Sequence, residues 1–197
     1  MRTAGILLAA GRGSRYGMPK ALAPVGGRLM SERALATLRD GGADPIVVVV
    51  GAGAAEVRAR LAPGTARLVD NPDWATGMGS SLRTGLEALA GHDDAEAAVV
   101  LLVDTPGITP AAVARLIAAG SGPDALLAAS YRGKQGHPVL LGRAHWDGVR
   151  AAAVGDTGAK PYLAAHRDLL RLVPCDDIAD GTDVDTPPAA DSGRNSS

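Results

Sequence analysis

Short, continuous apolar runs recur along the chain and are separated by stretches with helical character. The runs are rich in Val, Ile and Leu and alternate little with polar residues, which is typical of strands buried on both faces of a parallel sheet. The predicted strands are residues 6–9, 46–50, 66–69 and 98–103, with 125–129, 139–141 and 169–173 as further candidates.

Helices are predicted between these strands, at residues 31–40, 54–61, 80–90 and 110–119. Thr109 followed by Pro110 places a favourable N-cap residue before a proline at the first helical position. Strands and helices that alternate at this rhythm predict an α/β fold, in which a three-layer, doubly wound and mostly parallel sheet is covered by helices on both faces.

The rhythm changes after about residue 130, where a glycine-rich turn and a short strand precede helices near residues 145–153 and 158–165. We expect a single domain over residues 1–190. The last segment, residues 191–197, is small and polar, and we expect it to be a disordered tail.

The composition narrows the class of protein. The 197 residues carry a net charge of -1, which argues against a nucleic-acid binder, and no apolar run is long enough to span a membrane. One cysteine, Cys175, excludes an internal disulfide, and the short apolar N-terminal stretch is unlike a signal peptide, so we expect a cytoplasmic protein. Phe is absent and aromatic residues make up 3%, so the core has to form by close approach of small-residue elements.

The first predicted strand leads into the segment AAGRGSRYGMPK, residues 9–20. Its glycines leave backbone N–H groups accessible to phosphate oxygens, and Arg12, Arg15 and Lys20 supply positive charge. The spacing fits neither a dinucleotide fingerprint nor a Walker A loop. Because three cations lie within nine residues, we predict phosphate binding here over an ordinary strand-to-helix turn.

Acidic residues occur at two places that could form one metal site. Asp104 follows the fourth predicted strand, where ligands of open α/β sheets bind, although Asp-Thr-Pro is also good turn chemistry. Mg²⁺ prefers such oxygen ligands and bridges them to phosphates. A second cluster near the end of the chain is equally compatible with a solvated acidic loop; it contains Asp176, Asp177, Asp180, Asp183 and Asp185.

Three further segments carry candidate ligand contacts. NPDWATGMGSSL, residues 71–82, combines Gly77 and Gly79 with Ser80 and Ser81, which would cap a helix or reach a ligand. Residues 133–139 place His137 in a glycine-rich approach to a strand, where it is either a ligand contact or an ordinary packed histidine. Residues 155–160, GDTGAK, fit a turn before a helix equally well.

Taken in order, these motifs resemble the nucleotidyltransferases of molybdenum cofactor biosynthesis, and in particular the cytidylyltransferase branch. The resemblance covers about residues 4–187. LAAGRGSRYGMPK is similar to the family pattern L-A-A-G-x-x-x-R-x-G-x-x-K, and NPDWATGMGSSLRTGL is similar to N-x-x-W-x-x-G-M-x-x-S-[LI]-x-x-G. GHPVL, GDTGAK and DVDTP follow at the corresponding places.

The resemblance implies a Rossmann-like fold of the nucleotide-diphospho-sugar transferase type and a reaction that needs Mg²⁺ or Mn²⁺. CMP would move from CTP to a phosphorylated small-molecule acceptor, in the first place a molybdopterin, with release of pyrophosphate. Ala10 stands where guanylyl-transferring relatives have glycine, and its methyl group narrows the space for a purine. The implied catalytic residues are Arg15, Lys20 and Asp104, and the implied metal ligands are Asp104 with Asp183 or Asp185. The nucleotide would be bound by Arg15 and Lys20 together with Ala9, Ala10, Gly11, Arg12, Gly13, Gly79, Ser80 and Ser81. The residues on the acceptor side would be His137, Gly155 and Asp156.

Two departures from the family pattern leave the acceptor open. Thr105 stands where the family usually has Met, and Tyr16 where its first loop often has Met. The alternatives are transfer from GTP, transfer to another phosphorylated acceptor, or a related non-transferase such as a nicotine blue reductase-like or cofactor-delivery protein. The chain lacks a dinucleotide fingerprint and a redox cysteine pair, which argues against reduction. Partners implied by the resemblance include transient contacts with a molybdoenzyme or its chaperone.

Overall fold

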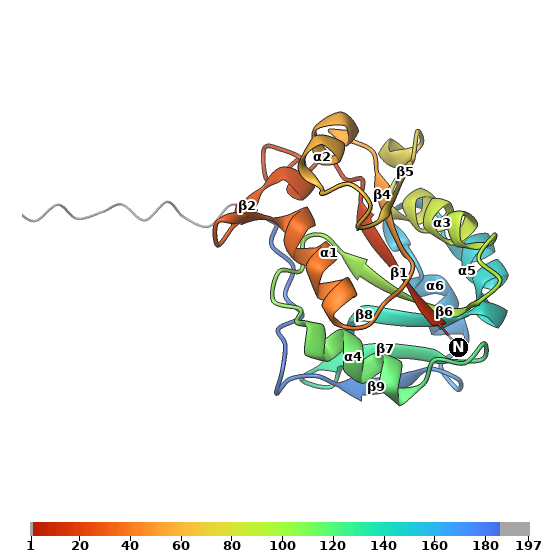
Figure 1. Ribbon diagram of the computed structural model, residues 1–197. Helices are drawn as coiled ribbons and strands as arrows, with labels where there is room; N and C mark the ends of the chain where they lie inside the picture. Colours follow the sequence, from red (N-terminus) through yellow and green to blue (C-terminus); the bar gives the residue numbers. More distant parts are fainter. Residues whose placement is uncertain (1, 186–197) are drawn as a thin grey trace, which may run out of the picture.

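The computed structural model describes residues 2–185 and shows a seven-stranded sheet between two layers of helices (Figure 1). Neighbouring strands run parallel, except that β8 is antiparallel to both β6 and β7. The strands, in their order across the sheet, are β5 (Arg67–Asp70), β4 (Ile46–Val50), β1 (Arg2–Ala9), β6 (Ala95–Leu102), β8 (Lys134–Gly142), β7 (Leu126–Tyr131) and β9 (Arg171–Pro174).

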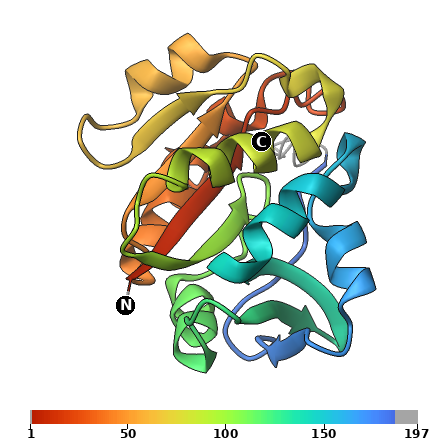
Figure 2. The same ribbon diagram turned by 90° about the vertical axis from the view of Figure 1, so that its right-hand side faces the viewer.

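Helices cover both faces of the sheet, as the alternation of strands and helices predicts, and Figure 2 shows the second face. Their apolar residues form two separate cores, one on each side of the sheet. One face packs against α1 (Met30–Asp40), α2 (Ala54–Arg60) and α4 (Pro110–Ala119), and the other against α3 (Met78–Leu89), α5 (Trp146–Ala152) and α6 (Lys160–Ala165). The three-layer, doubly wound, mostly parallel α/β fold is therefore confirmed.

Close approach replaces large side chains in the core. Gly85 of α3 lies directly over β1, and a Cβ atom at this position would come within 2.7 Å of Ile6 Cγ2. Leu82, Leu86 and Leu89 of the same helix are fully buried on the same face of the sheet. A core without Phe thus keeps its packing density, because the backbone of α3 comes very close to β1 at this glycine.

The start of α4 lies where the sequence predicts it. The Thr109 hydroxyl accepts a hydrogen bond from Ala112 N at 3.3 Å, and Pro110 is the first helical residue. The main differences are at hairpins. β8 begins at Lys134, because Arg132 and Gly133 form a tight turn with positive φ angles of 53° and 73° that pairs β8 with β7.

A short hairpin also follows the first loop, formed by β2 (Pro24–Val25) and β3 (Arg28–Leu29) around two glycines. The sequence pattern does not predict it, because two-residue strands show no periodicity.

The chain after β9 returns across the carboxyl ends of the strands. Asp180 N donates to Gly107 O at 3.1 Å, and Val184 N donates to Asp104 O at 2.8 Å. The late acidic segment is thereby held beside the loop that follows β6.

The predicted tail, residues 191–197, lies outside the described residues. Within residues 2–185, no helix has the length and apolar character needed to cross a membrane.

Candidate active site

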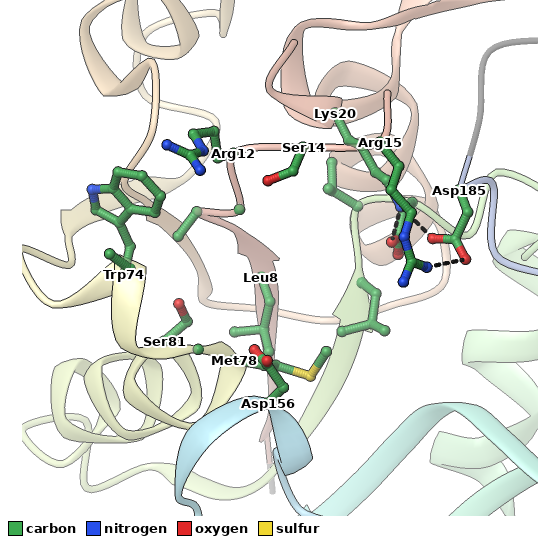
Figure 3. A pocket seen from close by; sticks show the side chains of 18 residues that line it. Leu8, Arg12, Ser14, Arg15, Lys20, Trp74, Met78, Ser81, Asp156 and Asp185 are labelled. Carbon is green, nitrogen blue, oxygen red and sulfur yellow. Dashed lines mark hydrogen bonds and ion pairs between the residues drawn. The ribbon is translucent and has the colours of Figure 1, made fainter. Parts of the chain in front are cut away.

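A cavity of about 480 Å³ lies over the carboxyl ends of β1 and β6 (Figure 3). Its walls come from the loop after β1, the turn η2 (Trp74–Thr76) with the start of α3, the loop after β6, the turn at Asp156 and the late acidic segment. Ten of the residues that the sequence assigns to the site line this first cavity: Ala10, Gly11, Arg12, Gly13, Arg15, Lys20, Ser81, Asp104, Asp156 and Asp185.

The alternation of β1 decides which alanine faces the cavity. Leu8 and Ala10 lie on the α3 side of the sheet and line the cavity, whereas Ala9 is buried in the core on the opposite side. The expectation that both alanines lie against a base therefore needs correction. Successive side chains of a strand point to opposite faces, so the Ala9 methyl group cannot join Ala10 in the wall.

The loop after β1 is a tight turn built on Gly13. Its carbonyl oxygen accepts hydrogen bonds from Tyr16 N at 2.9 Å and Gly17 N at 3.0 Å. Gly13 has a φ of 64°, and a Cβ atom there would overlap the carbonyl oxygen of Met18. The turn carries two exposed arginines: Figure 3 shows Arg12 beside Trp74, which also lines the cavity, and Arg15 beside Asp185.

Lys20 is the central cation of the site. Its Nζ atom lies 2.8 Å from Asp104 Oδ2 and 3.0 Å from Asp185 Oδ1, and its side chain is only 14% exposed. Burial by itself would lower the pKa of Lys20, but the hydrogen bonds and charges of the two carboxylates raise it. The same hydrogen bond from Lys20 lowers the pKa of Asp185. Lys20 is therefore held in its charged form.

Arg15 adds a weaker contact to this group. Its guanidinium lies 3.8 Å from Asp185 Oδ2, and its side chain is 80% exposed. An ion pair at such exposure contributes little by itself, because water screens it. Arg15 is thus free to move toward a bound anion at the mouth of the cavity.

Three carboxylates converge beside Lys20. Asp104, Asp183 and Asp185 each present an oxygen atom, and these atoms lie within 4.8 Å of one another. A set of oxygen ligands suits Mg²⁺ and Mn²⁺. The sequence left open which of the two late residues joins Asp104, and the structure places both of them there.

The other late aspartates have structural partners elsewhere. Asp177 forms two hydrogen bonds to Arg115, at 2.6 and 2.8 Å, and this pairing lowers the pKa of Asp177. Asp176 accepts from Arg132 N at 2.6 Å, and Asp180 accepts from the backbone and hydroxyl of Thr182. These contacts hold the segment in place, while Asp185 lines the first cavity and Asp183 lines the cavity beside it.

A buried asparagine organises the entrance to α3. Asn71 Nδ2 donates to Ser80 Oγ at 2.8 Å and to Ser81 Oγ at 3.0 Å, and its Oδ1 accepts from Asp73 N at 3.0 Å. Ser80 also donates to backbone carbonyls of residues 73 and 77 and does not line the first cavity. Ser80 therefore helps to hold the start of α3 in place, and Ser81 stands at the cavity wall.

Two glycines assigned to the site also have packing roles. A Cβ atom at Gly79 would lie 2.7 Å from Ala153 O, so this position lets α3 approach the end of α5. The backbone of Gly155 packs against Gly77, and a Cβ atom at Gly77 would overlap the carbonyl group of Gly155. Gly79 and Gly155 line neither the first cavity nor the one beside it, because backbone segments meet at both places.

A second cavity, of about 280 Å³, adjoins the first. Met78, Leu102, Asp104 and Asp156 line both cavities, so the carboxylate cluster stands at their junction. His137 lines the second cavity, as expected for the acceptor side, and burial lowers its pKa to about 4. Its imidazole is therefore neutral at neutral pH.

Several wall residues were not singled out from the sequence. Trp74 and Met78 line the first cavity, and Gln135 and Lys160 line the second. The W-x-x-G-M part of the second motif was a usable signal for the first two. Gln135 carries no signal of its own, whereas Lys160 ends the GDTGAK motif, which the resemblance did not connect with a site role for this lysine.

Residues 5–170 match the MobA-like NTP transferase domain family. The chain belongs to this family. The matched region contains the first loop, Lys20 and Asp104. The late segment with Asp183 and Asp185 follows the matched region.

Among similar proteins, the nicotine blue oxidoreductase of Paenarthrobacter nicotinovorans is 38% identical over 190 residues, which cover 92% of this chain and 91% of that protein. The crystal structure of Rv0371c from Mycobacterium tuberculosis H37Rv has a TM-score of 0.79 and 28% identity, with 94% of each chain covered. A homologue from Mycobacterium sp. strain JC1 has a TM-score of 0.77 and 33% identity, covering 94% of this chain and 92% of that one. Another structure of Rv0371c is a complex with manganese.

Proposed function

We propose that this protein transfers CMP from CTP to a phosphorylated small-molecule acceptor, in the first place a molybdopterin, with Mg²⁺ or Mn²⁺ as cofactor. The observation that carries the proposal is the position of Lys20 and the three carboxylates at the junction of two cavities. One cavity has a glycine-rich loop with cations, suited to a triphosphate, and the other is a smaller space for a second substrate. In this proposal residues 1–190 act as one nucleotidyltransferase domain.

The acidic cluster fits a divalent cation. Asp104, Asp183 and Asp185 offer hard oxygen ligands, and the complex of Rv0371c with manganese shows that a similar protein binds such an ion. When bound, a divalent cation neutralises charge on the phosphates of the nucleotide and orients them. The three carboxylates would hold it.

The chain's own cations would act on the leaving group. In the proposed reaction an oxygen of the acceptor phosphate forms a bond to the α-phosphorus of CTP, while the bond from that phosphorus to the bridging oxygen breaks and pyrophosphate leaves. Lys20 and Arg15 lie on the loop side of the first cavity, where their charges would stabilise the developing pyrophosphate. No covalent enzyme intermediate is needed.

The choice of CTP rests on the wall formed by Ala10. Trp74 lies on the same wall, and a Cβ atom at Gly51 would come within 2.6 Å of Trp74 Cβ and 2.9 Å of Ala10 Cβ. Gly51 therefore lets Trp74 and Ala10 stand side by side in the wall, and the Ala10 methyl group occupies space that a glycine at this position would leave open. A pyrimidine ring needs less room there than a purine, which favours CTP over GTP.

A second candidate function is reduction of a substrate like nicotine blue. The similarity to the nicotine blue oxidoreductase supports it, since it extends over nine-tenths of both proteins. A reductase has to bind a hydride donor, however, and the loop after β1 lacks the dinucleotide fingerprint. Retention of Lys20 beside three carboxylates also has no evident use in hydride transfer.

Calorimetric titration with CTP and with GTP, each in the presence of Mg²⁺ or Mn²⁺, tests the proposal. We expect cation-dependent binding that favours CTP in the wild type and is lost in Asp104→Ala, while circular dichroism stays unchanged. Asp177→Ala is the matched control, because that carboxylate pairs with Arg115 away from the cavity.

Preference for GTP would refute the argument from Ala10 but keep nucleotidyl transfer. Absence of binding to either nucleotide, combined with oxidation of NADPH or NADH in the presence of nicotine blue, would favour the reductase instead.

A further inference from the structure

The second cavity has an apolar side and a polar side. Val139 and Leu163 are almost fully buried and contribute hydrocarbon surface, whereas Gln135 and Lys160 contribute polar groups. A volume of about 280 Å³ is near the lower limit of small-molecule sites. The cavity therefore suits a compact molecule with one apolar body and polar or charged edges.

The three lysines of the chain have different surroundings. Lys20 is engaged by two carboxylates, and Lys134 is exposed at the start of β8 and lines neither cavity. Lys160 lines the second cavity, and the ion pairs found among residues 2–185 do not include it. Its charge is thus available to a ligand.

The charged side chains that line the second cavity are mostly negative. Asp104, Asp156 and Asp183 line the second cavity, and a divalent cation held by Asp104 and Asp183 would leave the Asp156 carboxylate to repel an approaching anion. Arg12, Arg15 and Lys20 line only the first cavity, and His137 is neutral at neutral pH. Among the described lining residues of the second cavity, Lys160 alone carries a permanent positive charge.

We propose that Lys160 binds the phosphate group of the acceptor in the second cavity. This inference rests on the proposed nucleotidyl transfer and names the residue that recognises the phosphate of the acceptor. Lys160 offsets the repulsion between the acceptor phosphate and the Asp156 carboxylate, which is not one of the proposed metal ligands. Val139 and Leu163 contact the apolar body of the acceptor, and Gln135 and His137 are placed to hydrogen-bond its edges.

Binding of two matched probes tests this assignment. The first probe is 4-methylumbelliferyl phosphate, a bicyclic ring with a phosphomonoester, and the second is 7-methoxy-4-methylcoumarin, the same ring without the charge. We expect the wild type to bind the phosphate ester at least about tenfold more tightly than the neutral ring, because a charge-assisted contact is lost in the latter.

Lys160→Ala should reduce affinity for the phosphate ester about tenfold and leave the neutral ring unchanged. Lys160→Arg should retain most of the affinity, because it keeps the charge. Lys134→Ala is the matched control and should behave like the wild type. The assignment is overturned if the wild type does not bind the phosphate ester, or if Lys160→Ala binds it as well as the wild type does.

Titration of CTP into the same variants separates this inference from the proposed function. We expect Lys160→Ala to bind CTP with unchanged affinity, since Lys160 does not line the first cavity. A parallel loss of CTP affinity would contradict an acceptor-side role. If the wild type fails to bind CTP but discriminates the two probes through Lys160, the proposed nucleotide chemistry fails while the phosphate site remains.

Discussion

The two cavities are built in different ways. The first takes its loop side from one short segment, residues 9–20, in which a strand end, a glycine turn and three cations are contiguous. The second is assembled from the start of β8, the turn η4 (Gly155–Thr157), α6 and the late acidic segment. The first surface depends on local chain geometry, whereas the second depends on how distant elements pack.

The same contrast appears between two cations of the first loop. Lys20 is largely buried and contacts two carboxylates, while Arg15 is mostly exposed and touches one of them at 3.8 Å. Only Lys20 connects the loop to the cluster at the junction. Its replacement should therefore affect both sides of the site, and replacement of Arg15 should affect one.

The largest expected effect comes from Lys20→Met, which keeps the length of the side chain and removes its charge. Affinity for CTP with Mn²⁺ should fall about thirtyfold, whereas Arg15→Met should cost about threefold or less. Affinity for Mn²⁺ alone should rise in Lys20→Met, because the ammonium group no longer occupies Asp104 and Asp185. Calorimetry and electron paramagnetic resonance measure the two affinities. Equal losses in the two variants would remove the distinction between these cations.

An effect of similar size, on stability and not on binding, is expected from Gly13→Ala in the first loop. The new methyl group would overlap Met18 O, and the backbone would be strained at a φ of 64°, so the free energy of unfolding should fall by about 2 kcal/mol. Gly11→Ala is the matched control, because its Cβ atom has no neighbour within 4 Å, and it should change stability by less than about 0.5 kcal/mol. Urea unfolding measures both, and similar values would show that the turn does not need glycine at position 13.

The smallest effect concerns His137 on the acceptor side. Burial lowers its pKa in the folded protein from 6.5 to about 4, so between these pH values the unfolded chain binds more protons. The stability contributed by the neutral imidazole is therefore complete above about pH 6.5 and is lost as the pH falls toward 4. At pH 5 this loss should be about 1 kcal/mol, after allowance for partial exposure.

His137→Gln should remove this contribution. Urea unfolding at pH 7 and pH 5 should show a smaller decrease in stability for the variant than for the wild type. An equal decrease would mean that His137 titrates normally and that the acceptor side is more open to water than the structure indicates.

Much of the fold follows from local pattern. The continuous apolar runs at residues 46–50 and 98–103 indicate buried strands, and Thr109 with Pro110 marks a helix start that the structure confirms. The antiparallel direction of β8 does not follow from the sequence pattern, because it depends on the Arg132–Gly133 turn and on pairing with β7. Hydrophobic periodicity contains no information about direction.

For the candidate site, the chain by itself determined the chemistry that is contiguous: the glycine turn, its cations, and an aspartate directly after a buried strand. Only the tertiary structure decided how five late aspartates divide between structural pairs and the cluster, and which cavity Lys160 faces. It also decided that Ala10 and not Ala9 forms the wall. The reason is that a carboxylate's role depends on which partner comes within hydrogen-bonding distance, and such partners are brought together by packing across the sheet.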